Sequence, residues 1–494
     1  MTWAKTQTQG GTSRAVNMVK VLWLIPCGLM VRDAFDAAHS WAISALSEDV
    51  LTSLFSFLSR SPITISHVCS SWRNIVIASP SCWTTLSRGH SLQKAPVIEK
   101  LSAFLERSGT LPLTIDLQIG SYRVDEELCQ EIMELMEPHA PRWRYFYFYT
   151  NNPECLCIAF FTLQRLSEDV PILEHLSVNA SPNIHHSQLG WMMADNRLTS
   201  TVLPDESNIL EDGAPSLRGF RTFGVASQFF LPPLSSITTL ILRDPTPVAF
   251  TPLRLRQILK LRKLECLYIG GWFFAKQNLD QQMFRFMLKH KKPIVMKRLR
   301  HLNISGVNGP DSLLPILFSQ IGGAPELQSI MLVDQVIPIN LTEFATTSFP
   351  TVVQLKLIRC RLQRDDDGSG SCAPFLSMFP NTKYLSISTG DVPTDIMPYL
   401  TTSPPQSEVP VLPSLRMFTC PRPSRVDLDG LSEYRDCWRE GLLPDPRLKL
   451  LRQTEEAEGW LEKGWFHDLR WPPNPGCWDE DLCTRGEEYF GGDI

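Results

Sequence analysis

A short apolar unit recurs along most of this chain and limits what the chain can fold into. The unit reads apolar-x-x-apolar-x-apolar, and clear successive copies start at residues 264, 299, 327 and 352, which are 25 to 35 residues apart. Its last two apolar residues are two positions apart, so on a β-strand they point to the same face. The copies start at Trp143, Leu173, Ile237, Leu264, Leu299, Leu327 and Val352, with weaker ones at Leu217, Tyr384 and Leu415.

Helical patterns alternate with these strand patterns. Apolar residues at helical spacing predict helices over 97–105 and 128–136, and alternating residues predict a strand over 111–117 between them. Further helices are expected over 281–290 and 312–320. Such alternation is typical of an α/β protein in which parallel strands stack into one sheet and helices cover one side of it.

The repeated unit resembles an irregular leucine-rich repeat, whose period it approaches. That family places Asn or Cys after the strand. This chain does so only at Asn151 and Cys360, three residues past Phe148 and Leu357. The resemblance implies a leucine-rich-repeat solenoid with a parallel sheet over residues 89–426. The alternative is a non-repetitive α/β domain in which the spacing arises from strand composition alone.

A second constraint comes from residues 46–86, ahead of the repeats. Two apolar helical faces and two tryptophans, Trp72 and Trp83, fall in a segment too short to bury them alone. Glu48 and Asp49 suit the first turn of one helix. Ser61-Pro62 suits the start of a second, with an apolar face that runs to Val76, and a short third turn carries Trp83 and Leu86. The segment therefore needs a covering surface, on this chain or on a partner.

This segment resembles the F-box, and in detail the large F-box families of mushroom-forming fungi. The residues that carry the resemblance are Leu46, Leu54-Phe55, Val68-Cys69-Ser70-Ser71-Trp72-Arg73 and Cys82-Trp83. Ser47 stands in place of the family's usual Pro, and Ser61-Pro62-Ile63 in place of its usual Asp-Leu. These departures are of a kind that weakens adaptor binding without removing the fold.

The resemblance implies a three-helix F-box over residues 41–88. Such a module binds a Skp-type adaptor and, through it, a cullin–RING ubiquitin ligase. The residues expected to contact the adaptor are Leu46, Val50, Leu54, Phe55, Leu58, Val68 and Trp72. The alternative is a helical hairpin that docks on the rest of this chain.

An F-box followed by leucine-rich repeats implies a substrate-recruiting subunit whose repeats bind a target protein. The alternative is an adaptor-bound scaffold or interaction protein without a degradation role. Strand positions that point away from the core are the candidate target-binding residues. They are Tyr145, Tyr147, Tyr268 and Lys356, together with Ser177, Asn303, Met331 and Ser386.

Catalytic motifs are not found in the sequence. It contains no GxxxxGK[ST] phosphate loop, no HExxH and no GxGxxG after a strand. We therefore nominate no catalytic residue and no cofactor, and expect partner proteins to carry out ubiquitin transfer. The 13 cysteines are scattered without a CxxC pair, which favours a reducing compartment, the cytoplasm or the nucleus, over a metal site. The net charge of −5 argues against a nucleic-acid partner.

The two ends of the chain differ in character from its middle. Residues 1–40 contain an apolar run over 21–31 that is too short to span a bilayer, so no membrane partner is expected. We interpret them as a disordered, signal-like or mis-assigned extension. Residues 427–494 are rich in charge and tryptophan and are predicted to be a cap or tail, with a helix that contains Leu448, Leu451 and Ala457.

Overall fold

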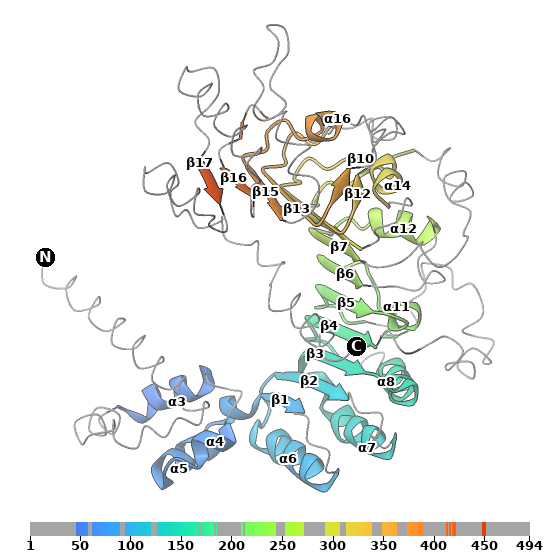
Figure 1. The fold of residues 1–494 in the computed structure, drawn as a ribbon. Coiled ribbons are helices and arrows are strands. Elements are labelled where there is room, and N and C mark those ends of the chain that lie inside the picture. Colours follow the sequence, from blue (N-terminus) through green and yellow to red (C-terminus); the bar gives the residue numbers. More distant parts are fainter. Residues whose placement is uncertain are drawn as a thin grey trace, which may run out of the picture. The chain divides into compact units, whose positions relative to one another are not determined.

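The chain divides into two compact units, Met1–Trp83 and Thr84–Ile494, in the computed structural model. The structure describes residues 46–57, 62–88, 94–119, 126–166, 170–181, 184, 209–210, 213–243, 252–270, 292–306, 313–337, 348–362, 373–388, 412, 414–415, 417–420 and 447–450. Over these residues the first unit is helical, and the second is a mixed α/β unit with one large parallel sheet (Figure 1). None of the helices in these ranges combines the length and apolar character that crossing a bilayer requires.

The first unit contains the helices α3 (Glu48–Phe57), α4 (Pro62–Ser66) and α5 (Ser70–Ala78), followed by the 3-10 turn η2 (Pro80–Trp83). Pro62 starts α4, where its missing N–H costs no helical hydrogen bond. The prediction of one continuous helix from Pro62 to Val76 is wrong. The backbone at Cys69 is extended, with φ of −157°, and its sulfur caps α5 by accepting a hydrogen bond from the Trp72 N–H at 3.5 Å.

These helices share a small apolar core. The ring of Phe55 contacts that of Trp72, with centroids 5.0 Å apart, and so joins α3 to α5. The indole N–H of Trp83 donates to the carbonyl of Val76 at 2.8 Å, which ties η2 to the end of α5. The core is completed by Leu51, Ile65, Ile75 and Cys82.

The second unit is organised around a parallel sheet of 13 strands whose order in space follows their order along the chain (Figure 1). The strands are β1 (Thr85–Arg88), β2 (Leu113–Ile119), β3 (Trp143–Thr150), β4 (His175–Ala180), β5 (Gly219–Phe223), β6 (Thr239–Arg243), β7 (Cys266–Gly270), β9 (His301–Ser305), β11 (Ser329–Val333), β13 (Gln354–Ile358), β15 (Tyr384–Ser388), β16 (Met417–Cys420) and β17 (Arg447–Leu450). Two short parallel pairs lie outside this sheet: β8 (Ile294–Val295) with β10 (Ile321–Gly323), and β12 (Val336–Ile337) with β14 (Arg361–Leu362).

The strands pair in register, so each apolar unit of the sequence stacks on the next. Leu302 of β9 pairs with Ile330 of β11, and Ile304 pairs with Leu332. All four side chains are at most 1% exposed. In most units the first apolar residue lies ahead of its strand and is buried as well, as at Leu173, Leu217, Ile237, Leu264, Leu299, Leu327, Val352 and Leu415. The strand prediction from the repeated unit is confirmed.

Helices between the strands cover the buried side of the sheet. They are α6 (Lys94–Arg107), α7 (Glu126–Met136), α8 (Pro153–Arg165), α11 (Ala226–Phe229), α12 (Pro252–Leu259), α14 (Leu313–Gln320) and α16 (Ala373–Ser377), with the 3-10 turn η3 (Glu137–Arg142) after α7. Figure 1 shows α6, α7, α8, α11 and α12 on the same side of the strands. The helices predicted over 97–105, 128–136 and 312–320 are confirmed, whereas residues 281–290 lie outside the described part.

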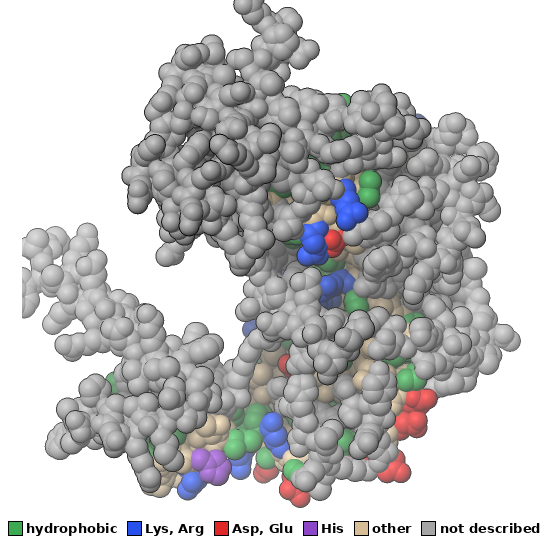
Figure 2. Space-filling model, in the orientation of Figure 1, with side chains coloured by type: hydrophobic (Ala, Val, Ile, Leu, Met, Phe, Trp, Pro, Cys, Tyr) green, Lys and Arg blue, Asp and Glu red, His purple; other side chains and the backbone are tan. Residues whose placement is uncertain are grey.

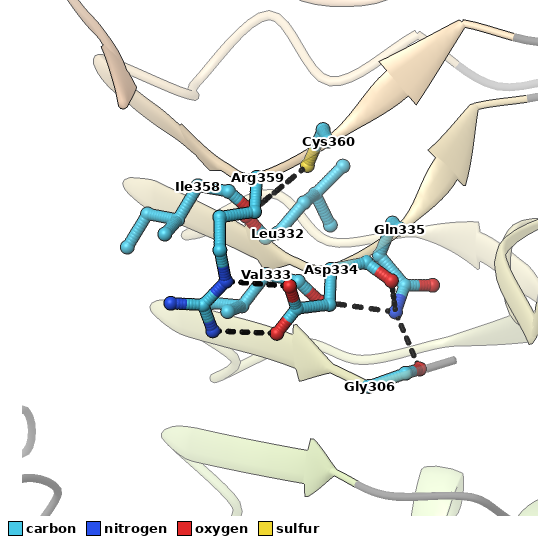
Figure 3. Close-up of polar contacts among 8 residues, drawn as sticks. All are labelled: Gly306, Leu332, Val333, Asp334, Gln335, Ile358, Arg359 and Cys360. Carbon is cyan, nitrogen blue, oxygen red and sulfur yellow. Dashed lines mark hydrogen bonds and ion pairs between the residues drawn. The ribbon is translucent and has the colours of Figure 1, made fainter. Parts of the chain in front are cut away.

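A tight turn recurs where several middle strands end. Gly224, Gly306, Asp334 and Arg359 each lie two residues past the last buried strand residue and have φ of 65°, 82°, 54° and 50°. Glycine adopts this left-handed conformation without steric cost, whereas another residue pays about 1–3 kcal/mol. The two residues other than glycine contact each other. The Arg359 guanidinium donates two hydrogen bonds of 2.6 Å to the Asp334 carboxylate (Figure 3).

The residue that follows Asp334 and the residue that follows Arg359 each donate a hydrogen bond to a backbone carbonyl. The Gln335 side-chain N–H donates to the Gly306 carbonyl at 2.7 Å, and the Cys360 thiol donates to the Leu332 carbonyl at 3.4 Å (Figure 3). Burial raises the pKa of the Cys360 thiol to about 12, so the thiol keeps the proton that it donates. The sequence pattern identified Cys360 but missed Gln335, because glutamine is neither the Asn nor the Cys expected at this offset.

Two predicted boundaries differ from the structure. Thr85–Arg88 was expected within the helical segment, but it forms strand β1, and Leu86 pairs with Ile115 of β2. The sheet also continues past residue 426, because Arg447–Leu450 forms β17 and Leu448 pairs with Phe418 of β16. The helix predicted around Leu448 is therefore wrong, since Leu448 and Leu450 follow strand spacing. Residues 1–40 and the rest of 427–494 lie outside the described part.

Candidate interaction surfaces

The helical unit presents large apolar side chains on its surface. Val50 is 45% exposed, Ile63 41%, Val68 52% and Ile77 44%. These four make up half of the large apolar residues that are exposed among the described residues, although they lie within 46–83. Four exposed apolar side chains within so small a unit make its surface a candidate for contact with another chain.

The residues predicted to contact an adaptor are divided between this surface and the core. Val50 and Val68 are exposed, and Leu46, Leu54 and Trp72 are half-buried. Leu58 lies outside the described residues. Phe55 is only 1% exposed, so its predicted place on the surface is wrong. Its ring packs on Trp72 inside the hairpin.

Sequence reasoning missed two members of the exposed group, Ile63 and Ile77. Ile63 stands where the F-box pattern departs from its usual Asp-Leu, so the motif gave it no role. Ile77 follows the buried pair Ile75 and Val76 and points away from them because adjacent helical residues are about 100° apart. A helical wheel of the α5 sequence would have placed Ile77 away from the buried face.

The sheet unit presents a different surface, which we call the open face. It consists of the strand positions from β2 to β15 that alternate with the buried ones. Most of the predicted target-binding residues fall into one row that crosses the strands. In register order the row contains Asp116, Tyr147, Ser177, Arg221, Ile241, Tyr268, Asn303, Met331, Lys356 and Ser386. Tyr145 belongs to the adjacent row, beside His175.

The predicted residues of this row differ in accessibility. Tyr147, Ser177, Met331 and Lys356 are half-buried and can contact another molecule. Tyr268, Asn303 and Ser386 are 7%, 1% and 5% exposed, so most of their surface is covered. Alternation along a strand predicts the face of a residue but not how far its neighbours cover it, which explains the difference.

Tyr145 belongs to a polar cluster where β3 and β4 begin. Its ring stacks on that of His175, with centroids 4.9 Å apart. Its hydroxyl donates to the Glu174 carboxylate at 3.3 Å, and Arg144 pairs with the same carboxylate at 3.1 Å. The hydrogen bond from Arg144 lowers the pKa of Glu174, and burial raises the pKa of Tyr145. Because these groups satisfy one another, the cluster positions Tyr145 rather than leaving an open charge.

Tyr147 lies in the centre of β3, between opposite charges on the open face. Burial raises the pKa of its hydroxyl, the Asp116 carboxylate raises it further, and the Arg221 guanidinium opposes both. The phenol therefore stays protonated at neutral pH, as a hydrogen-bond donor among half-buried neighbours. Aromatic residues of this kind are frequent anchors in protein–protein interfaces.

A second aromatic group surrounds Arg243 at the end of β6. The Arg243 guanidinium carbon lies 5.9 Å from the ring centroid of Phe223 on β5 and 5.9 Å from that of Tyr268 on β7. The hydroxyls of Tyr268 and Ser305 are hydrogen-bonded at 2.6 Å. Sequence reasoning selected Tyr268 but not Arg243, although Arg243 stands at an open strand position.

Basic side chains reach the surface over the middle strands in the view of Figure 2. Within the described ranges, no group of three or more His, Cys, Asp or Glu side chains is arranged to hold a metal ion. Comparison with profiles of known protein families and with curated proteins finds no match for this chain. The geometry gives two candidate interaction surfaces, one apolar on the helices and the other a mixed polar and aromatic face on the parallel sheet.

Proposed function

We propose that this chain is a substrate-recruiting subunit of a Skp–cullin–F-box ubiquitin ligase, acting in the cytoplasm or nucleus. The helical unit is the F-box and binds the Skp-type adaptor. The parallel sheet is an irregular leucine-rich-repeat array, and its open face binds the target protein. Partner proteins carry out ubiquitin transfer.

The observation that carries this proposal is the exposed apolar group on the helical unit. The motif residues Phe55 and Trp72 join α3 to α5, and Trp83 fixes η2 to α5. With those residues in the core, Val50 and Val68 are left exposed on the same small unit. Because each of these valines is about half exposed, burying the exposed part in an interface contributes about 0.7 kcal/mol. A standard interface buries about 800 Å² on each partner.

The test is co-purification of the full chain with a Skp-type adaptor. A double variant, Val50→Asp with Val68→Asp, is expected to bind the adaptor at least about tenfold more weakly, because two valine contacts of about 0.7 kcal/mol each are lost and two carboxylates lose solvation in the interface. The matched control is Val295→Asp, since Val295 is 55% exposed on β8 of the other unit. Unchanged adaptor binding by the double variant, with its helical circular dichroism intact, refutes the F-box assignment.

Degradation is tested separately from adaptor binding. Deletion of residues 41–83, which leaves β1 in place, is expected to stabilise proteins that co-purify with the sheet unit. A protein that keeps binding while its half-life is unchanged by this deletion identifies the chain as an adaptor-bound scaffold instead.

A further inference from the structure

The open face carries an uneven distribution of charge. On β4 to β13 its strand positions contain three basic residues, Arg221, Arg243 and Lys356, and no aspartate or glutamate. The whole chain has a net charge of −5, so this excess of positive charge is local. The acidic residues Glu174 and Glu265, where β4 and β7 begin, are already paired with arginines.

Arg243 is held in a defined orientation within this region. The rings of Phe223 and Tyr268 lie on either side of it at the same distance, 5.9 Å from the guanidinium carbon, which is within the range of cation–π attraction. Contact with aromatic rings on two flanking strands restricts its rotamers. A guanidinium held by its neighbours loses less conformational freedom when an anion binds.

Gly270 creates the space that the Tyr268 ring occupies. Gly270 is the register partner of Arg243 on β7, so any side chain there would stand beside the guanidinium. A Cβ at this position would lie 2.7 Å from a carbon of the Tyr268 ring. With no side chain at Gly270, the ring extends along its own strand and its hydroxyl reaches Ser305. The aromatic neighbour of Arg243 therefore depends on this glycine.

No carboxylate pairs with Arg243 among the residues that the structure describes. This differs from Arg144, Arg165, Arg300 and Arg359, each of which has an acidic partner within 3.6 Å. A half-buried arginine positioned by two aromatic rings and lacking its counter-charge is suited to receive a carboxylate from another molecule.

We propose that the open face over β5 to β13 binds an extended acidic segment of the target protein, with one carboxylate at Arg243 and a second near Lys356. β6 and β13 are four strand spacings apart in the sheet, about 19 Å at about 4.8 Å each. An extended peptide covers that distance in about six residues. A carboxylate is favoured over a phosphate because Arg243 offers a single positive charge, which matches one carboxylate.

This inference rests on the proposal that the open face binds a target, and it does not require the ligase role. The probes are fluorescein-labelled peptides of otherwise random sequence, with two fixed positions about six residues apart. Three pools are prepared, in which both fixed positions are glutamate, both are glutamine or both are phosphoserine. Binding of each pool to the full-length chain is measured by fluorescence anisotropy. The glutamate pool is expected to bind most tightly, with an affinity that falls as salt is added.

Variants then locate the contact. Arg243→Gln is expected to weaken glutamate-pool binding about tenfold, or about 1.4 kcal/mol, and to leave glutamine-pool binding unchanged. Arg243→Lys keeps the charge but loses the planar fork, so an intermediate loss is expected. Lys263→Gln is the matched control, because it removes the same charge from an exposed residue ahead of β7.

Equal binding of the glutamate and glutamine pools overturns the inference, as does a preference for phosphoserine or an Arg243→Gln variant that keeps the full preference. Adaptor co-purification is measured on the same preparations. Loss of the glutamate preference with adaptor binding intact rejects the acidic segment alone. A retained preference without adaptor binding rejects the ligase role alone.

Discussion

The helical unit and the sheet unit expose different kinds of side chain, although both are built from apolar-rich sequence. On the helices, Val50, Ile63, Val68 and Ile77 are each more than 40% exposed. On the middle strands β5, β6, β11 and β13, alternate residues are buried, and the open positions carry arginine, lysine and other polar residues together with apolar ones such as Ile241 and Met331. The helical surface therefore suits a broad apolar partner, and the open face suits a charged, extended one.

The difference follows from how each unit completes its core. A strand of the sheet has a neighbour on both sides and a helix layer beneath, so its apolar residues are buried by adjacent copies of the same unit. The helical unit has one layer of short helices, and its core is filled by Phe55, Trp72 and Trp83. Outside that core, four large apolar side chains of the described part of the unit remain exposed: Val50, Ile63, Val68 and Ile77.

The sharpest test of this contrast compares core and surface within the helical unit. Phe55→Ala is expected to lower the free energy of unfolding of this unit by about 3–5 kcal/mol, because a buried ring is lost next to Trp72. Val50→Ala on the same helix is expected to change it by less than about 0.5 kcal/mol, because its side chain is already exposed.

Hydrogen–deuterium exchange of the amides in α3 and α5 measures both effects in the full-length chain. Similar loss of protection in the two variants would mean that Val50 is part of the core, and the distinction between core and docking surface on these helices would fail.

The repeated apolar unit determined most of the sheet, but not the details of either surface. Spacing placed Leu302 and Ile304 on the buried face and Asn303 on the other one, and the structure agrees. It did not show that Asn303 is covered, because coverage depends on neighbouring strands that pair across 25 or more residues. The ring position of Tyr268 was equally hidden, since it depends on Gly270 in its own strand and Ser305 in the next.

The errors at the ends of the predicted segments have a common cause. A helix was expected around Leu448 because Leu448, Leu451 and Ala457 could share one helical face, but Leu448 and Leu450 alternate and extend the sheet beside β16. Residues 62–76 were predicted as one helix, and the interruption at Cys69 depends on a thiol cap that helical spacing does not reveal. Local pattern predicts element type well where the unit repeats and less well where it occurs once.

The open face contains a half-buried histidine, His301, at the start of β9. Burial of the His301 ring, with repulsion from Arg300, lowers its pKa from 6.5 to about 4. Between these values the unfolded chain binds more protons than the folded one. The free energy of unfolding therefore falls as the pH decreases through this window, by at most about 1.4 kcal/mol per pH unit.

Replacing His301 with Gln removes the titration and retains a side chain that can bond to the Ser329 hydroxyl, now 2.8 Å from the ring nitrogen. Urea unfolding of the sheet unit at a series of pH values is expected to show a shallower acid loss in this variant than in the parent chain. Identical pH profiles would show that the ring is not desolvated by the sheet.

The smallest expected effect concerns the turns that end the middle strands and keep the open-face rows aligned. Asp334→Gly and Asp334→Ala both remove the ion pair with Arg359. At φ of 54° alanine has a steric cost of about 1–2 kcal/mol, and the greater freedom of unfolded glycine offsets about 0.5–1 kcal/mol of it, so the Gly variant is expected to be more stable than the Ala variant by about 0.5–1 kcal/mol. Urea unfolding of the two variants side by side cancels the shared loss of the ion pair.

Equal stability of the two variants would mean that the positive φ at Asp334 carries no cost, and that the recurrence of Gly at 224 and 306 reflects close backbone packing instead. Such close packing exists at Gly224, where an added Cβ would lie 2.9 Å from the Ala180 carbonyl oxygen.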